Sequence, residues 1–118
     1  MASKKTRDDV ITFFETLTAR RFSDAGKALN ELRGKNFGNN EFKDGYIMAL
    51  EGLLLSSRTG DDRDFYNRAE FETQKALNNY KKEFRSFAKE GINSPYDTGF
   101  FQAWSDLIQY RSDNQKKS

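Results

Sequence analysis

Hydrophobic residues recur along the chain at spacings of three and four, the period of helices that bury one face. Capping residues and glycines divide this pattern into five segments. We therefore expect an all-α fold class with helices over about 6–17, 23–32, 41–57, 62–90 and 94–111. Valine, which is enriched in strands, occurs once in the chain, and this scarcity counts against a sheet.

Short polar residues and glycines mark the expected helix ends. Thr6 and Ser23 precede apolar stripes and are predicted N-caps, and Ser94-Pro95 is predicted to be a cap followed by a first-turn proline. Gly60 is predicted to end the third helix. These signals set the boundaries of the predicted helices.

Part of the pattern repeats. The segment 42–54 matches 96–108 at a constant offset of 54 residues, and the pairs formed by positions 42, 45, 46, 47, 49, 50, 53 and 54 keep their aromatic, small or apolar character. The string Lys-Ala-Leu-Asn at 27–30 also recurs at 75–78. We expect two related antiparallel α-hairpins, with the first helix packed alongside them.

Small residues form a strip on both matched helices. Gly45, Ala49 and Gly52 follow one another on the third helix, and Gly99 and Ala103 occupy the matching strip on the last. Glycine inside a helix costs about 1 kcal/mol relative to alanine, so a compensating gain is expected. The predicted gain is the close approach of a neighbouring helix backbone, with a ligand as the less favoured explanation.

Helical hairpins with small residues at crossing points resemble tetratricopeptide-type repeats in architecture, over about residues 21–111. The repeat here is longer than the tetratricopeptide period of about 34 residues, and the first hairpin lacks the signature of that family. The segments 44–54 and 98–104 are also similar to a small group of uncharacterised archaeal helical proteins. This resemblance implies a hairpin-based helical fold and brings no activity, cofactor or functional residue.

Length and composition favour one domain spanning residues 1–118, with flexible tails at 1–6 and 112–118. The formal net charge of the 118 residues is +2, charged residues make up 32% of the chain, and the mean hydropathy is -0.92. No apolar run is long enough to span a membrane, and no signal-type segment follows Met1. We therefore expect a cytoplasmic protein that does not contact membranes.

The absent residue types argue against catalysis. The chain contains no Cys and no His, which excludes thiolate nucleophiles, imidazole bases and thiolate or imidazole metal ligands. Asp61, Asp62 and Asp64 have the spacing that opens a calcium loop, but they fit the N-terminus of a helix better. We predict that the protein is not an enzyme and binds no cofactor or metal.

Cations repeat every seven residues along the predicted fourth helix, which places them on one face. Such a strip, with one aromatic residue on it, is able to follow a phosphate backbone and stack a base. The simpler interpretation is a solvated face, with the aromatic residue turned inward at a helix break near 69–70. The candidate nucleic-acid-binding residues are Arg68, Phe71, Lys75, Lys82, Arg85 and Lys89.

The chain has more aromatic residues than the apolar faces of the predicted helices contain. Phe13, Phe37 and Tyr110 lie off or at the edge of the apolar stripes, and their exposure together would indicate a protein partner or a homo-oligomer. The predicted function is a non-catalytic helical module for macromolecular interaction or self-assembly. The alternative is an RNA- or ribosome-associated protein that uses the basic face of the fourth helix.

Overall fold

The computed structural model describes residues 4–60, 73–89 and 94–117. Every regular element in these ranges is an α-helix, which confirms the all-α prediction. The elements are α1 (Lys4–Thr18), α2 (Phe22–Arg33), α3 (Asn40–Thr59), α5 (Gln74–Lys89) and α6 (Pro95–Lys117). None of these helices combines the length and the apolar character that crossing a membrane requires.

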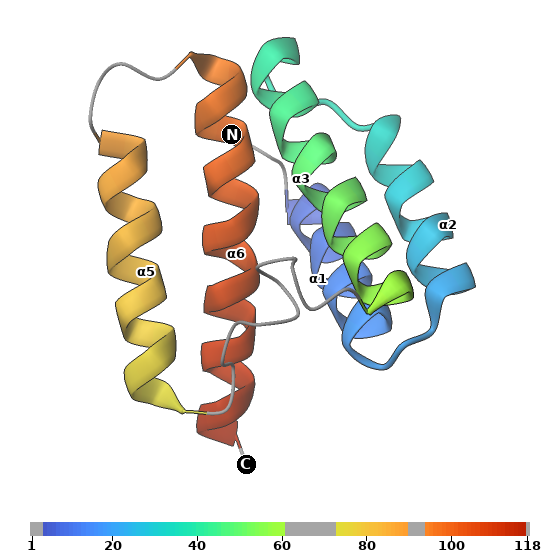
Figure 1. Cartoon of the computed structure of the whole chain (residues 1–118). Coiled ribbons are helices and arrows are strands. Elements are labelled where there is room, and N and C mark those ends of the chain that lie inside the picture. Colours follow the sequence, from blue (N-terminus) through green and yellow to red (C-terminus); the bar gives the residue numbers. More distant parts are fainter. Residues whose placement is uncertain (1–3, 61–72, 90–93, 118) are drawn as a thin grey trace.

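The helices form two antiparallel hairpins, α2–α3 and α5–α6, as the sequence pattern predicts (Figure 1). The second helices of the two hairpins, α3 and α6, lie side by side at the centre and run in the same direction (Figure 1). Helix α1 packs mainly against α2. The chain therefore has a central helix pair with α5 on one side and α1 and α2 on the other.

Two glycines form the contact between α3 and α6. An alanine side chain at Gly45 would overlap the carbonyl oxygen of Tyr96 and lie 3.1 Å from the amide nitrogen of Phe100. An alanine at Gly99 would overlap the carbonyl oxygen of Phe42 in the same way and lie 3.1 Å from the amide nitrogen of Tyr46. Each glycine thus meets the backbone of the opposite helix at equivalent residues. The residues that each glycine meets are related by the same 54-residue offset as the sequence repeat, so the two helices contact each other in the same way.

The small-residue strip is only partly buried in this crossing. Ala49 and Ala103 are buried next to the two glycines. Gly52, predicted to belong to the same strip, is exposed, and no heavy atom lies within 4 Å of a side chain built there. The prediction was wrong for Gly52 because α3 and α6 diverge before they reach it.

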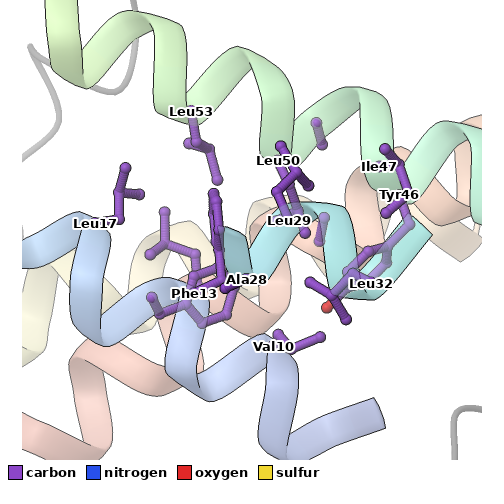
Figure 2. Packing of buried hydrophobic residues seen from close by; sticks show 14 of the residues in the cluster. Val10, Phe13, Leu17, Ala28, Leu29, Leu32, Tyr46, Ile47, Leu50 and Leu53 are labelled. Atoms are coloured by element: carbon purple, nitrogen blue, oxygen red, sulfur yellow. The ribbon is translucent and has the colours of Figure 1, made fainter. Parts of the chain in front are cut away.

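The main core lies between α1, α2 and α3. Figure 2 shows apolar side chains of these helices directed toward one another, including Val10 and Phe13 of α1, Leu29 of α2 and Leu50 of α3. Phe13 and Phe37 are buried in this core, and Tyr110 packs against it, half-buried. These three aromatic residues are therefore not exposed together, so they do not form the apolar surface that would have indicated a partner.

A smaller apolar cluster joins α5 to α6. Leu77 and Leu107 are buried, and the Phe84 ring stacks on Trp104 with centroids 5.6 Å apart and an interplanar angle of 14°. Phe84 also lies 6.3 Å from the Phe101 ring, centroid to centroid. Ring pairs of this kind add to the stability that burial alone gives, so the three aromatic rings help to hold α5 against α6.

Two of the predicted N-caps were wrong. Thr6 lies inside α1, because the helix already begins at Lys4, and its side chain is buried with 2% exposure. Ser23 lies inside α2, whose N-cap is Arg21, without a capping side-chain hydrogen bond. The Ser94 cap is confirmed by its hydroxyl, which accepts a hydrogen bond from the Asp97 amide at 3.2 Å. Gly60 ends α3 in the left-handed conformation, as predicted, with φ of 67°.

The fourth predicted helix is not continuous from 62 to 90. Thr73 is non-helical, and its hydroxyl accepts a hydrogen bond from the Ala76 amide at 3.2 Å, which caps α5 at Gln74. A threonine that satisfies a free amide in this way marks a helix start. The predicted portion at 62–72 lies outside the described residues.

The predicted flexible tail after Arg111 was also wrong. Helix α6 continues to Lys117, and Ser112 is 0% exposed. The Ser112 hydroxyl donates to the Gln74 side-chain oxygen at 3.1 Å, and the Gln74 amide donates to the Ser112 carbonyl at 3.0 Å. These two hydrogen bonds connect Ser112, the first residue of this polar segment, to the start of α5.

Candidate binding groove

A half-open groove of about 1100 Å³ lies between α1, the start of α3 and one face of α6. Its floor and walls are mainly apolar, and polar side chains of α6 line one side. Ligand sites in proteins are typically concave, apolar and furnished with a few convergent polar groups. Of the hollows in the described chain, this one matches that description best.

Five aromatic rings surround the groove. Phe14 of α1 lies 5.6 Å from Tyr110 of α6, between ring centroids. Tyr46 of α3 lies 5.3 Å from Phe37 and 6.1 Å from Phe42. The first pair connects α1 to α6, and the other three rings form the wall at the start of α3. The aromatic packing thus holds the three helices around the groove.

One carboxylate lies among these rings. Asp106 is half-buried, and its Oδ2 accepts a hydrogen bond from the Tyr46 hydroxyl at 2.6 Å. Its Oδ1 accepts one from the Gln102 amide at 2.8 Å. Burial raises the pKa of Asp106 above its ordinary value, while these two hydrogen bonds and the positive charge of Arg7 oppose the rise.

Tyr46 is the neutral partner of this pair. Its side chain is almost fully buried, and burial raises its pKa well above the ordinary value. The negative charge of Asp106 and the hydrogen bond to it raise the pKa of Tyr46 further. Tyr46 therefore remains a hydrogen-bond donor at neutral pH and holds the carboxylate in place.

The sequence of α6 explains why Asp106 faces the groove. Positions 102, 106 and 109 lie on one face of the helix, and all three line the groove. Ala103 and Leu107 lie on the opposite side and are buried. Sequence reasoning did not identify Asp106, because a polar face on an amphipathic helix ordinarily faces solvent. The aromatic residues beside it were the available signal, and they were assigned to packing.

The groove does not coincide with the predicted basic strip. Lys75 and Lys82 are exposed on α5, away from the groove lining. Arg85 and Lys89 belong to α5, but their side chains lie outside the described part of the structure, as do Arg68 and Phe71 entirely. Two described residues of the strip therefore face solvent on one helix.

Two large apolar side chains of α3 are exposed. Met48 is 48% exposed and Leu55 is 62% exposed, and both lie on the outer face of α3. These are the large hydrophobic residues that the described chain leaves exposed. Single exposed apolar residues are normal on protein surfaces, so this pair alone does not define an interface.

Within the described ranges, carboxylates do not gather in groups of three or more that would suit a metal ion. Asp61, Asp62 and Asp64 lie outside those ranges. No protein family, curated protein or solved structure matches the chain.

Proposed function

We propose that this protein is a cytoplasmic, non-catalytic binding module whose groove between α1, α3 and α6 receives a segment of a partner protein. The observation that carries the proposal is the groove itself, with five aromatic rings around one oriented carboxylate. Aromatic residues are enriched where proteins recognise one another, and clefts between packed helices commonly receive peptide segments.

The openness of the groove favours a protein segment over a metabolite. Pockets for small ligands occupy about 300–1000 Å³ and enclose most of the ligand surface. This groove, at about 1100 Å³, is at the upper end of that range, and it is half-open to solvent, so it would not enclose a small ligand. A chain segment is able to lie in it while its flanks remain in water.

The groove chemistry also favours binding over catalysis. The Tyr46 hydroxyl already donates its proton to Asp106, so it is not free to act as an acid, while the Asp106 carboxylate keeps lone pairs that can accept a donor from a partner. Their roles are instead to fix one another and to present a polar anchor within an apolar surface. The sequence supplies no Cys or His to work beside them.

A random peptide library displayed on phage, selected against the full chain, tests the proposal. We expect enriched peptides whose binding is lost in Gln109→Trp, because Gln109 is exposed and lines the groove. Asn79→Trp, at an exposed position of α5 that does not line the groove, is the matched control and should bind normally. Selection of no peptides, or equal binding by both variants, would contradict the proposal.

RNA binding is the second candidate, supported by the exposure of Lys75 and Lys82 seven residues apart on α5. Contacts to phosphates predict affinity that falls steeply with salt. Lys75→Glu combined with Lys82→Glu should then abolish RNA binding in a mobility-shift assay. Gln109→Trp should leave it unchanged. Salt-independent binding, or no binding by the unaltered chain, would remove this candidate.

A further inference from the structure

We infer that the groove selects partner segments carrying a lysine or arginine side chain, whose cationic head pairs with Asp106. This inference rests on the proposed function and specifies its partner. It combines the charge that lines the groove, the neutral hydrogen-bond donors of the Asp106 carboxylate, on which Arg7 acts only through its charge, and the apolar surface beside it. Each of these features favours an organic cation on a flexible stem.

The charge of the lining is the first feature. Three carboxylates line the groove, from Glu15, Asp106 and Asp113, against the single guanidinium of Arg7. The groove therefore has an excess of negative charge, although the chain as a whole carries a net charge of +2. Complementary charge steers a cationic segment toward this face and disfavours an acidic one.

The second feature is that the Asp106 carboxylate is held by neutral groups. Both of its hydrogen-bond donors, Tyr46 and Gln102, are uncharged. The ion pairs in the described ranges form between other residues, and Asp106 belongs to none of them. A partly buried carboxylate without a paired cation gains from an incoming one, because a charge-assisted hydrogen bond is stronger than a neutral one.

The third feature is the apolar surface next to the carboxylate. Val10, Ile11 and Phe42 line the same groove as Asp106. Lysine and arginine have long aliphatic stems that pack on such surfaces while the charged head reaches a polar group. A bare metal ion would require several oxygen ligands, and the described residues form no such group.

The packing of α3 against α6 does not require an acidic residue at position 106. The repeat aligns Asp106 with Gly52 of α3, and α3 crosses α6 without a carboxylate there. Asp106 also lies on the groove side of α6, away from Ala103 and Leu107 in the core. Its position is consistent with a binding role that only one of the two hairpins carries.

The test compares peptides and variants in the full chain. Peptides selected from the random library should contain a Lys or Arg, and replacing that residue by norleucine or citrulline should weaken binding about tenfold or more, measured by fluorescence anisotropy. Asp106→Asn, which keeps the shape and an oxygen acceptor for Tyr46, should weaken the unaltered peptide to the same extent. It should not weaken the norleucine or citrulline peptide further.

Asp97→Asn is the matched control, because Asp97 is an exposed carboxylate of α6 that does not line the groove. We expect it to change affinity less than about threefold, as screened surface charges do. Peptides that bind in the groove without a cation, or that tolerate Asp106→Asn, would overturn this inference and leave the proposed function intact. If no peptide is selected at all, both fail.

Discussion

The two hairpins share their buried residues and differ on one outward face. In α3 and α6, the aligned pairs Gly45 and Gly99, Ala49 and Ala103, and Leu53 and Leu107 are all buried. The crossing of the two helices requires small or apolar residues at these positions, so both copies keep them. The shared pattern reflects packing.

The outward face of the same helices is different in each copy. Met48, Gly52 and Leu55 on α3 align with Gln102, Asp106 and Gln109 on α6. The three α3 residues are exposed, whereas the three α6 residues line the groove. The two helices therefore share one packing pattern and carry different outward surfaces, and the polar side chains that line the groove lie on α6.

Alanine at either crossing glycine should give the largest loss of stability. Gly45→Ala and Gly99→Ala each place a methyl group into the backbone of the opposite helix, which cannot rotate away. We expect each to lower the free energy of unfolding by about 3 kcal/mol or more, and by similar amounts. Urea unfolding followed by circular dichroism measures this.

Gly52→Ala is the control on the same helix, and it should raise the free energy of unfolding instead of lowering it. Its side chain would meet no atom within 4 Å, so only the gain in helix propensity remains. That gain is about 1 kcal/mol of stabilisation. Unequal losses of stability in Gly45→Ala and Gly99→Ala would indicate that the two glycines do not make equivalent contacts. A loss of stability in Gly52→Ala would indicate that α6 also packs against Gly52.

The hydrogen bonds within each hairpin should contribute unequally. Gln74 and buried Ser112 exchange two hydrogen bonds between α5 and α6, whereas Arg33 and Glu51 form an exposed ion pair at 2.7 Å between α2 and α3. Gln74→Ala should cost about 2 kcal/mol, because it leaves buried polar atoms unpaired. Glu51→Gln should change stability by less than about 0.5 kcal/mol. Equal effects in thermal or urea unfolding would contradict this.

The smallest expected effect is the contribution of Asp106 to the pH dependence of the free energy of unfolding. The pKa of Asp106 is raised on folding, so the folded chain binds more protons than the unfolded chain above about pH 4. Stability contributed by this group is complete below that pH and decreases as pH rises through the raised pKa. Asp106→Asn should remove this decrease in urea unfolding measured across a pH series. An identical pH dependence in the variant would contradict the expectation.

The helical period was sufficient to predict the fold class, and the glycines predicted the close approach of a neighbouring helix, which the structure identifies as the contact between α3 and α6. Gly45 and Gly99 were informative because glycine is costly inside a helix, and a cost repeated at equivalent positions requires a structural reason. Ser112 was misassigned because its partner, Gln74, lies 38 residues away in the chain. The groove around Asp106 was not predictable for the same reason, since three helices must be placed before it exists.

The glycine crossing also has a consequence for the entropy of association. Backbone meets backbone there, so no side-chain rotamer is able to adjust the spacing of α3 and α6. Two walls of the groove are thus fixed relative to each other before any partner arrives. The conformational cost of binding then falls mainly on the incoming segment, and a partner that is itself pre-ordered would gain affinity from that order alone.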